Sequence, residues 1–241
     1  HTRRSSDLYN EMIEEIDSLI KRGIHTEKDK RTYELSVLYE QIKPHFLYNT
    51  LDTIGYLVLA GDKERAYTAI ENLGSYYHGS LSHGSTVVTV EEELKIVTDY
   101  LELQKLRYGD IFDHKAEIEP GLERKKVLKL ILQPIVENSL YHGIRPGGVK
   151  GSIYIKVFRV QEELHLSVED TGVGMEPEKV EELYFGDKQE KSFGLCGTME
   201  RIRIYYSYKD CCDIKSSRGS GTKITFKLPL QLCREDQGDL K

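Results

Sequence analysis

A histidine lies in a helical pattern at QIKPHFLYNT, residues 41–50, where its imidazole could accept a phosphoryl group. At about 100° per residue, the apolar positions of this helix form one stripe: Leu47, Leu51, Ile54 and Val58. His45, Asn49 and Asp52 fall roughly opposite, so His45 is predicted to face outward. Pro44 removes a backbone donor and is expected to bend or loosen the helix beside it. This suits a side chain that must be reached, although a solvated histidine beside a structural kink would give the same pattern.

A second group of residues, further along the chain, has the chemistry of a nucleotide site. Asn138 follows Glu137 in LILQPIVENSLYHGI, and His142 comes four positions later on the same face of the predicted helix. The Asn138 amide oxygen could ligate Mg²⁺, which prefers hard oxygen ligands, and His142 could touch a phosphate. Taken singly, both residues could equally be polar groups on a helix surface.

Glycine-rich segments could complete such a pocket. In EDTGVGM the Asp170 carboxylate can accept a hydrogen bond from an exocyclic amine, and Gly172 and Gly174 let the backbone approach a flat ring closely. The pattern alone is weak, because a turn also favours Asp and Gly.

Two further positions offer backbone groups to a ligand. Gly194 and Leu195 open a predicted helix, whose free backbone N–H groups could meet phosphate. Gly221 and Thr222 precede the last predicted strand and could close the pocket, or form only a hairpin turn.

The elements that would position these residues divide the chain into a helical part and a mixed part. The helix through His45 and a second helix at 64–81, joined by a turn at 60–62, predict a helical hairpin. Thr89, followed by three glutamates, marks the start of another helix, and Gly109 marks its end. After the helical LKLILQPIVENSLYHGI, the strand-like IYIKVFRV, ELHLSVED and TKITFKLPL predict a sheet backed by helices.

Composition limits the class of protein. With 241 residues, of which 39% are hydrophobic, the chain can bury two modest cores or one large one. Its net charge of -6 is spread over 34 basic and 40 acidic residues, so no basic face argues for binding DNA or RNA. The four cysteines lack CxxC spacing, which is typical of a reduced, cytosolic chain. No apolar run of about 18 residues predicts a membrane span, and the first residues do not predict an export signal.

In this order and spacing, the parts resemble the sensor histidine kinases of the LytS/YesM type. That family's acceptor signature, roughly QINPHFLYNTLxxI, is matched by QIKPHFLYNTLDTI at 41–54. Its nucleotide-domain signature, roughly LQPLVENAxxHG, is matched by LQPIVENSLYHG at 132–143. Between them, EEELKIVTDYLELQKLRYGD at 91–110 is similar to the family's linking helix, and the resemblance extends over 33–229.

The resemblance implies a reaction. The γ-phosphoryl group of ATP would pass to His45, and from there to an aspartate of a separate response regulator. Asn49 shares the exposed face with His45 and could orient a water for dephosphorylation. Many histidine kinases carry an acid directly after the histidine, where this chain has Phe46. The general base is therefore not identified, and Asp52 and Glu137 are the candidates.

The resemblance also implies the nucleotide site. Asn138 would ligate Mg²⁺, and Asp170 would recognise adenine. The remaining pocket residues would bind or shape the site for ATP: His142, Gly172, Gly174, Gly194, Leu195, Gly221 and Thr222.

The fold implied is α+β, with a helical dimerisation hairpin followed by a Bergerat-type α/β sandwich that binds ATP. In a homodimer, two hairpins would form a four-helix bundle. The expected boundaries are 1–30 for the end of a HAMP or signalling helix, 31–88 for the hairpin, 89–112 for the linking helix, 113–231 for the ATP-binding domain and 232–241 for a tail. The chain is expected to be the cytoplasmic portion of a bacterial membrane receptor, attached to the membrane only through a segment upstream.

Departures from the family pattern leave alternatives open. The usual glycine box, GxGLxN, reads SFGLCG at 192–197, so its first glycine and its asparagine are missing and the grip on phosphate could be weaker. A degenerate module that binds nucleotide without transferring phosphate therefore stays open. The segment 176–191 would be a short lid over ATP, in which Lys188 and Lys191 are available to phosphates or simply solvated.

An ATPase like gyrase or the Hsp90 chaperones is disfavoured. The catalytic glutamate of those proteins lies four residues before the asparagine, and that place is Pro134 here. Proline cannot activate water.

Overall fold

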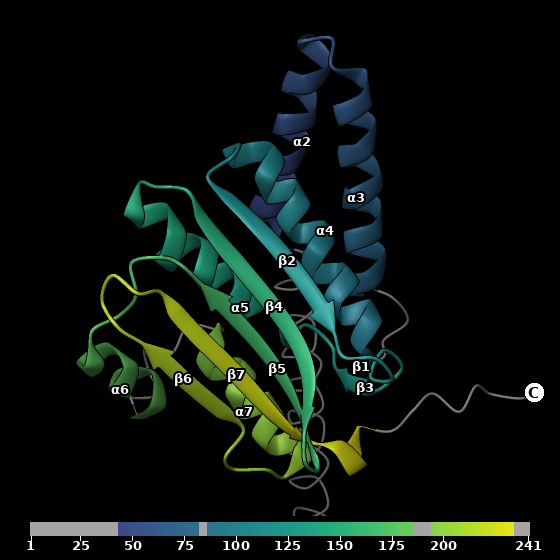
Figure 1. Ribbon diagram of the computed structural model, residues 1–241. Helices are drawn as coiled ribbons and strands as arrows, with labels where there is room; N and C mark the ends of the chain where they lie inside the picture. Colours follow the sequence, from purple (N-terminus) through teal and green to yellow (C-terminus); the bar gives the residue numbers. More distant parts are fainter. Residues whose placement is uncertain (1–42, 82–85, 186–193, 234–241) are drawn as a thin grey trace, which may run out of the picture. The chain divides into compact units, whose positions relative to one another are not determined.

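The computed structural model describes residues 43–81, 86–185 and 194–233 (Figure 1). The expected signalling helix at 1–30, Lys188, Lys191 and the first two residues of the glycine box lie outside the described residues. The chain divides into two compact units, 1–47 and 48–241. His45 therefore belongs to the first unit, and every other expected site residue belongs to the second.

The helical hairpin is confirmed as two helices, α2 (Pro44–Leu59) and α3 (Lys63–Leu81). Gly61 turns the chain between them at φ 78°, a conformation that favours glycine. The described part of α2 begins at Pro44, at a helix start, where a missing N–H is tolerated. The kink expected there stays a prediction, because the preceding turn lies outside the described residues.

The apolar stripe expected on α2 was only partly right. Ile54 is buried, but Leu51 and Val58 are 49% and 59% exposed. The buried positions are spaced four residues apart instead, at Phe46, Thr50 and Ile54. Within one chain, α2 thus turns a polar threonine inward and leaves much of its apolar stripe uncovered.

The next helix, α4 (Val90–Tyr108), starts and ends where the sequence predicts. The Thr89 hydroxyl accepts a hydrogen bond from the Glu92 N–H at 3.1 Å, and the Glu92 carboxylate accepts one from the Thr89 N–H at 2.7 Å. This reciprocal capping box satisfies backbone donors that a helix start otherwise leaves unpaired. At the other end, Gly109 adopts φ 67° and stops the helix.

The expected mixed α/β layer is confirmed as a five-stranded sheet in the order β2-β4-β5-β7-β6. Its strands are β2 (Phe112–Ile118), β4 (Gly151–Val160), β5 (Glu163–Asp170), β6 (Cys212–Ser216) and β7 (Thr222–Pro229). Only the β2–β4 pair among them is parallel. A separate ribbon pairs β1 (Val87–Thr89) with β3 (Lys126–Leu128).

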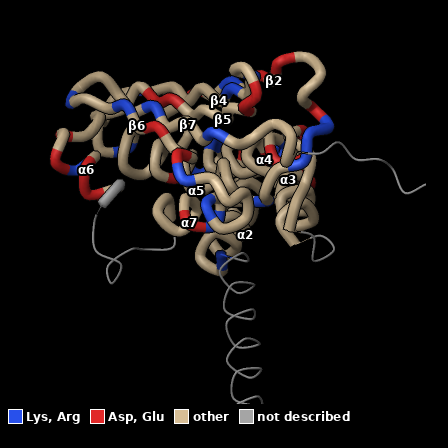
Figure 2. Tube along the Cα trace, turned by 90° about the horizontal axis from the view of Figure 1, so that it is seen from below, with Lys and Arg blue, Asp and Glu red and all other residues tan. Residues whose placement is uncertain are grey.

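Helices cover one face of the sheet, as Figure 2 shows with α5 and α7 beneath the strands. They are α5 (Gln133–Asn138), a π-helical segment η2 (Ser139–Ile144) and α7 (Leu195–Tyr206). A further helix, α6 (Pro177–Phe185), contacts α7 and the edge strand β6, and the short 3₁₀ turns are η3 (Arg145–Gly147) and η4 (Leu230–Leu232). The core forms where alternate strand residues meet the covering helices, and register partners such as Ile155 and Val168 are both fully buried.

The helix expected from Leu128 onward was wrong at its start, because α5 begins only at Gln133. Leu128 still belongs to β3, and Leu130 adopts a left-handed φ of 57°, which interrupts a right-handed helix. Pro134 then occupies the first turn of α5, where its ring is compatible with the helix.

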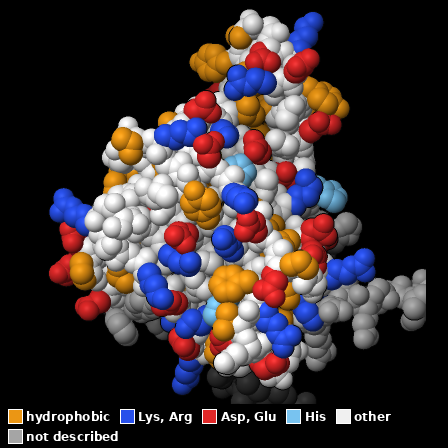
Figure 3. Space-filling model, in the orientation of Figure 1, with side chains coloured by type: hydrophobic (Ala, Val, Ile, Leu, Met, Phe, Trp, Pro, Cys, Tyr) orange, Lys and Arg blue, Asp and Glu red, His pale blue; other side chains and the backbone are white. Residues whose placement is uncertain are grey.

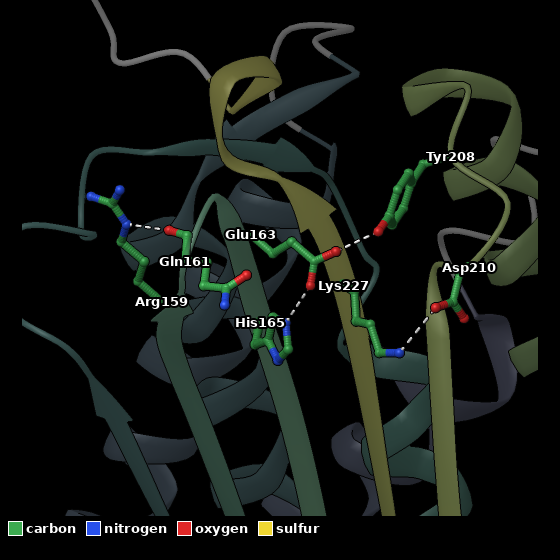
Figure 4. A network of polar contacts seen from close by, with 7 residues as sticks. All are labelled: Arg159, Gln161, Glu163, His165, Tyr208, Asp210 and Lys227. Atoms are coloured by element: carbon green, nitrogen blue, oxygen red, sulfur yellow. Dashed lines mark hydrogen bonds and ion pairs between the residues drawn. The ribbon is translucent and has the colours of Figure 1, made fainter.

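The other face of the sheet is open and carries charges of both signs, which alternate over the face shown in Figure 3. Directly opposed residues pair there, such as Glu169 with Lys223 at 2.9 Å. At the end of β5 farthest from Asp170, Glu163 accepts hydrogen bonds from Tyr208 and from His165 Nε2 (Figure 4). These donors hold the pKa of Glu163 below its usual range and tie the strand to the segment before β6.

Candidate functional site

His45 lies in the first turn of α2 and is exposed, as expected. Phe46, where an acid would stand in many histidine kinases, is buried. Asn49 is half-buried one turn later and lines a cavity of about 540 Å³ between α2, α3 and the end of α4. Asp52, one of the two candidate bases, lines the same cavity.

Asp170 is the last residue of β5, and its side chain is 3% exposed. Its Oδ1 atom accepts hydrogen bonds from the Gly172 N–H at 2.9 Å and from the Thr222 N–H at 3.3 Å, and the Ser139 side chain also donates to the carboxylate. Burial raises the pKa of Asp170, and these three donors oppose the rise. The carboxylate is thus held in one orientation, at the place where β5, β7 and η2 meet.

Gly172 is required by a close contact between two backbone segments. A Cβ atom at Gly172 would lie 2.2 Å from the carbonyl carbon of Gly143, at the end of the segment that carries Asn138 and His142. Beside it, the Val173 N–H donates to the Gly143 carbonyl at 2.9 Å. The loop after Asp170 therefore packs directly on η2, and this packing alone requires glycine at position 172. The expected close approach of Gly172 to a ligand ring stays a prediction.

Gly174 and Gly221 are likewise enclosed by backbone. Both have left-handed φ angles, 67° and 79°. A Cβ at Gly174 would lie 2.0 Å from the Ser217 carbonyl oxygen, and one at Gly221 would lie 1.9 Å from that of Asp170. Only glycine fits either position, so the β6–β7 hairpin and the Asp170 loop form one compact unit.

Asn138 is the last residue of α5 and is half-buried, whereas His142 is exposed in η2. A π-helical segment such as η2 is rare and frequently occurs at functional sites. Glu137, the other candidate base, accepts a hydrogen bond from Gln133 Nε2 at 2.9 Å. The same nitrogen donates to the buried Tyr76 hydroxyl at 2.8 Å, so the Glu137 carboxylate is turned toward α3.

Gly194 and Leu195 open α7, as expected, and Gly194 is its N-cap without any side-chain cap. Cys196, which stands within the altered glycine box, is partly exposed, and its thiol donates to the Leu183 carbonyl in α6. The structure thus joins Asp170 and Gly172 directly to the segment that carries Asn138. Gly221 and Thr222 contact Asp170, and Gly174 contacts the β6–β7 hairpin. Gly194 opens α7, which contacts α5.

These residues fit an adenine nucleotide with Mg²⁺. Asp170 is an oriented carboxylate acceptor in a largely buried place, which is what recognition of an amine requires. Asn138 offers an amide oxygen, a suitable hard ligand for Mg²⁺, whose other ligands are usually phosphates and waters. The N–H groups that begin α7 can face phosphate.

Three residues escaped the sequence reasoning. Ser139 and Gly143 lie inside the matched signature, yet the bond from Ser139 to Asp170 and the contact of Gly143 with Gly172 became evident only from the fold. Glu93 was taken as one of three acids in the first turn of α4, but its side chain is fully buried. The available signal was its spacing, because Glu93 precedes the buried Val97 and Leu101 at intervals of four residues and so shares their face.

Two family models match the chain. The first, histidine kinase, covers residues 33–112, and the second, histidine kinase-, DNA gyrase B- and HSP90-like ATPase, covers residues 123–232.

Similar proteins are also found by whole-chain comparison. Sensor histidine kinase YesM of Bacillus subtilis is 28% identical over 98% of this chain and 40% of its own length. Sensor protein kinase HptS of Staphylococcus aureus is 30% identical over 91% of this chain and 43% of its own length. The chain thus spans less than half the length of these relatives. Among solved structures, the histidine kinase domain of the Erythrobacter litoralis EL346 blue-light activated histidine kinase has a TM-score of 0.45 at 14% identity, covering 70% of this chain and 78% of that one.

Proposed function

The chain belongs to the sensor histidine kinases of the LytS/YesM type, and from that premise we propose that it phosphorylates His45 with ATP and passes the group to a response regulator. The observation that carries the proposal is the Asp170 cluster. It is a buried carboxylate held in one orientation, as recognition of an adenine amine requires, on the same chain as an exposed histidine in an acceptor signature.

In this proposal each residue has a defined task. Asp170 accepts a hydrogen bond from the adenine amine, in the orientation that Gly172 and Thr222 impose. Asn138 holds Mg²⁺, which neutralises phosphate charge when bound with ATP. The first N–H groups of α7, at Gly194 and Leu195, receive phosphate. His142 is a further phosphate contact, consistent with its exposed position.

The chemical step is a displacement at phosphorus. A neutral imidazole nitrogen of His45 forms the N–P bond while the bond between phosphorus and the β–γ bridging oxygen breaks, and ADP leaves. The reaction needs positioning more than covalent assistance from the protein. Asn49, one helical turn from His45, would orient water for hydrolysis of the phosphorylated histidine, which releases inorganic phosphate.

A homodimer is proposed from the uncovered apolar surface of the hairpin. Large apolar side chains on α2 and α3 are 49% to 85% exposed: Tyr48, Leu51, Tyr56, Val58, Leu59, Tyr67 and Ile70. Such a patch on one small element usually marks an interface. Two hairpins that cover each other would give the four-helix bundle expected from the resemblance.

The remaining assignments are proposals as well. We keep 1–30, 31–88, 89–112, 113–231 and 232–241 as the five segments. No helix among the described residues is long and apolar enough to cross a membrane. Attachment to a membrane through an upstream segment, with this part on the cytoplasmic side, is proposed because the relatives are more than twice as long as the aligned region.

The first test is incubation of the purified chain with γ-labelled ATP and Mg²⁺. Acid-labile label on the wild type, lost in His45→Gln and in Asn138→Ala, would support the proposal. The matched control is His78→Gln, which removes another exposed histidine of the hairpin and should keep the label. ATP binding without label would favour the degenerate module, and ATP hydrolysis without label would favour the ATPase alternative.

A further inference from the structure

Glu93 is a carboxylate buried completely between elements, with an exposed fraction of 0%. It lies in the first turn of α4, yet its side chain leaves that helix. Its Oε2 atom accepts a hydrogen bond from the Leu130 N–H at 2.7 Å, and its Oε1 atom accepts one from the Leu132 N–H at 2.9 Å. Both oxygens are therefore engaged by the backbone that leads into α5.

The residues just before α5 are the ones that Glu93 holds. The N–H groups of Ile135 and Val136 already donate to the carbonyl of Leu132, the N-cap residue, which provides no side-chain cap. Leu130 reaches its place through a left-handed φ of 57°, which turns its N–H toward α4. Glu93 thus fixes the N-cap residue of α5 and the turn before it, although it belongs to a helix about 40 residues earlier in the chain.

The same loop is held from the other side by α7. The Arg201 guanidinium donates to the Lys129 carbonyl at 2.7 Å, and its positive charge favours the ionised form of Glu93. Burial raises the pKa of Glu93, whereas the Leu130, Ile131 and Leu132 N–H groups and Arg201 lower it. The linking helix α4 and the helix α7 therefore both bind the segment 129–132, which leads into α5.

Asn138 follows closely, because α5 has only six residues, from Gln133 to Asn138. The N-terminal end that Glu93 holds and Asn138 are therefore separated by fewer than two helical turns. Glu93 is fully buried and cannot touch ATP or Mg²⁺ itself, so any effect that it has on their binding must act through α5.

We propose that Glu93 is a positioning residue of the nucleotide site, which fixes α5 to α4 and so sets the place of Asn138. Movement of the linking helix then changes how the chain holds Mg²⁺ with ATP. This inference rests on the proposed role of Asn138, but it does not require that phosphate reach His45.

The experiment is equilibrium binding of ATP to the whole chain, with and without Mg²⁺, for the wild type and Glu93→Gln. The variant keeps the size of the side chain, but its NH₂ group must face either the Leu130 or the Leu132 N–H, donor against donor. We expect the Mg²⁺-dependent gain in ATP affinity to fall at least fivefold, and affinity without Mg²⁺ to change less than twofold. The matched control is Glu91→Gln, which removes an exposed acid from the same turn and should leave both affinities unchanged.

Binding is measured well below the thermal midpoint of each variant, so that loss of folded protein does not enter. If Glu93→Gln does not fold, Arg201→Met is used instead, because it removes the hydrogen bond from Arg201 to the Lys129 carbonyl of the same loop. This variant should lower the same Mg²⁺-dependent gain in ATP affinity by a smaller factor. Equal losses with and without Mg²⁺, or no loss, would overturn the inference. Failure of the wild type to label His45 while it binds ATP with Mg²⁺ would refute the kinase proposal and leave this test valid.

Discussion

Tyr76→Phe tests whether α3 is tied to α5 by a single buried hydroxyl group. Tyr76 is 0% exposed, and its hydroxyl accepts a hydrogen bond from Gln133 Nε2 at 2.8 Å. Gln133 is itself 2% exposed, and the same nitrogen donates to Glu137 Oε1 at 2.9 Å. Phenylalanine would remove the acceptor and leave one N–H of the Gln133 amide buried without its partner.

The expected loss follows from that unpaired donor. A buried polar group without a partner costs about 1–3 kcal/mol, and removal of one oxygen adds little cavity, so we expect the free energy of unfolding to fall by about 2 kcal/mol. In a chain of this size the thermal midpoint should decrease by about 4–8 °C. The assay is thermal and urea unfolding followed by circular dichroism.

The control is Tyr67→Phe, whose ring is 63% exposed on the same helix and whose hydroxyl loss should change stability by no more than about 0.5 kcal/mol. A double variant separates the hydrogen bond from packing. Tyr76→Phe combined with Gln133→Leu removes both buried polar groups, so it should be less destabilised than the sum of the single variants. Additive losses, or an unchanged midpoint for Tyr76→Phe, would refute the reasoning.

Three shorter predictions concern other sites. Two lysines hold the pKa of Asp113 at about 2, below 3.8, so the carboxylate contributes stability above that range and loses it as pH falls toward 2. Asp113→Asn should flatten acid unfolding between these values, and an unchanged pH profile would contradict this. Iodoacetamide should modify Cys196 before Cys212, because Cys196 is partly exposed whereas burial raises the pKa of Cys212 to about 12. Peptide mass spectrometry measures the order of modification, and earlier labelling of Cys212 would contradict the prediction. Gly172→Ala should destabilise by about 1–3 kcal/mol through its clash with Gly143, as measured by urea unfolding, and wild-type stability would show that the loop can relax.

Local patterns were enough to predict much of the fold. Strands β4, β5 and β7 follow from alternation of apolar residues, and the start of α4 follows from Thr89 and its glutamates, because side-chain periodicity and capping act over a few residues. Strand β2 was not predicted, because its parallel partner lies beyond the next helix and its sequence is largely polar. Strand β6 was not predicted either, because it has only five residues and lies at the edge of the sheet, so its alternation of apolar and polar residues is too short to stand out.

The site divides in the same way. Type and spacing alone predicted His45, Asn138 and Asp170 as site residues, since each belongs to a short motif whose residues are close in sequence. The burial of Glu93 and the contact of Gly172 with Gly143 were decided only by the tertiary structure. These contacts join segments separated by about 30 to 40 residues, and their geometry depends on how whole helices and strands pack, which no local pattern specifies.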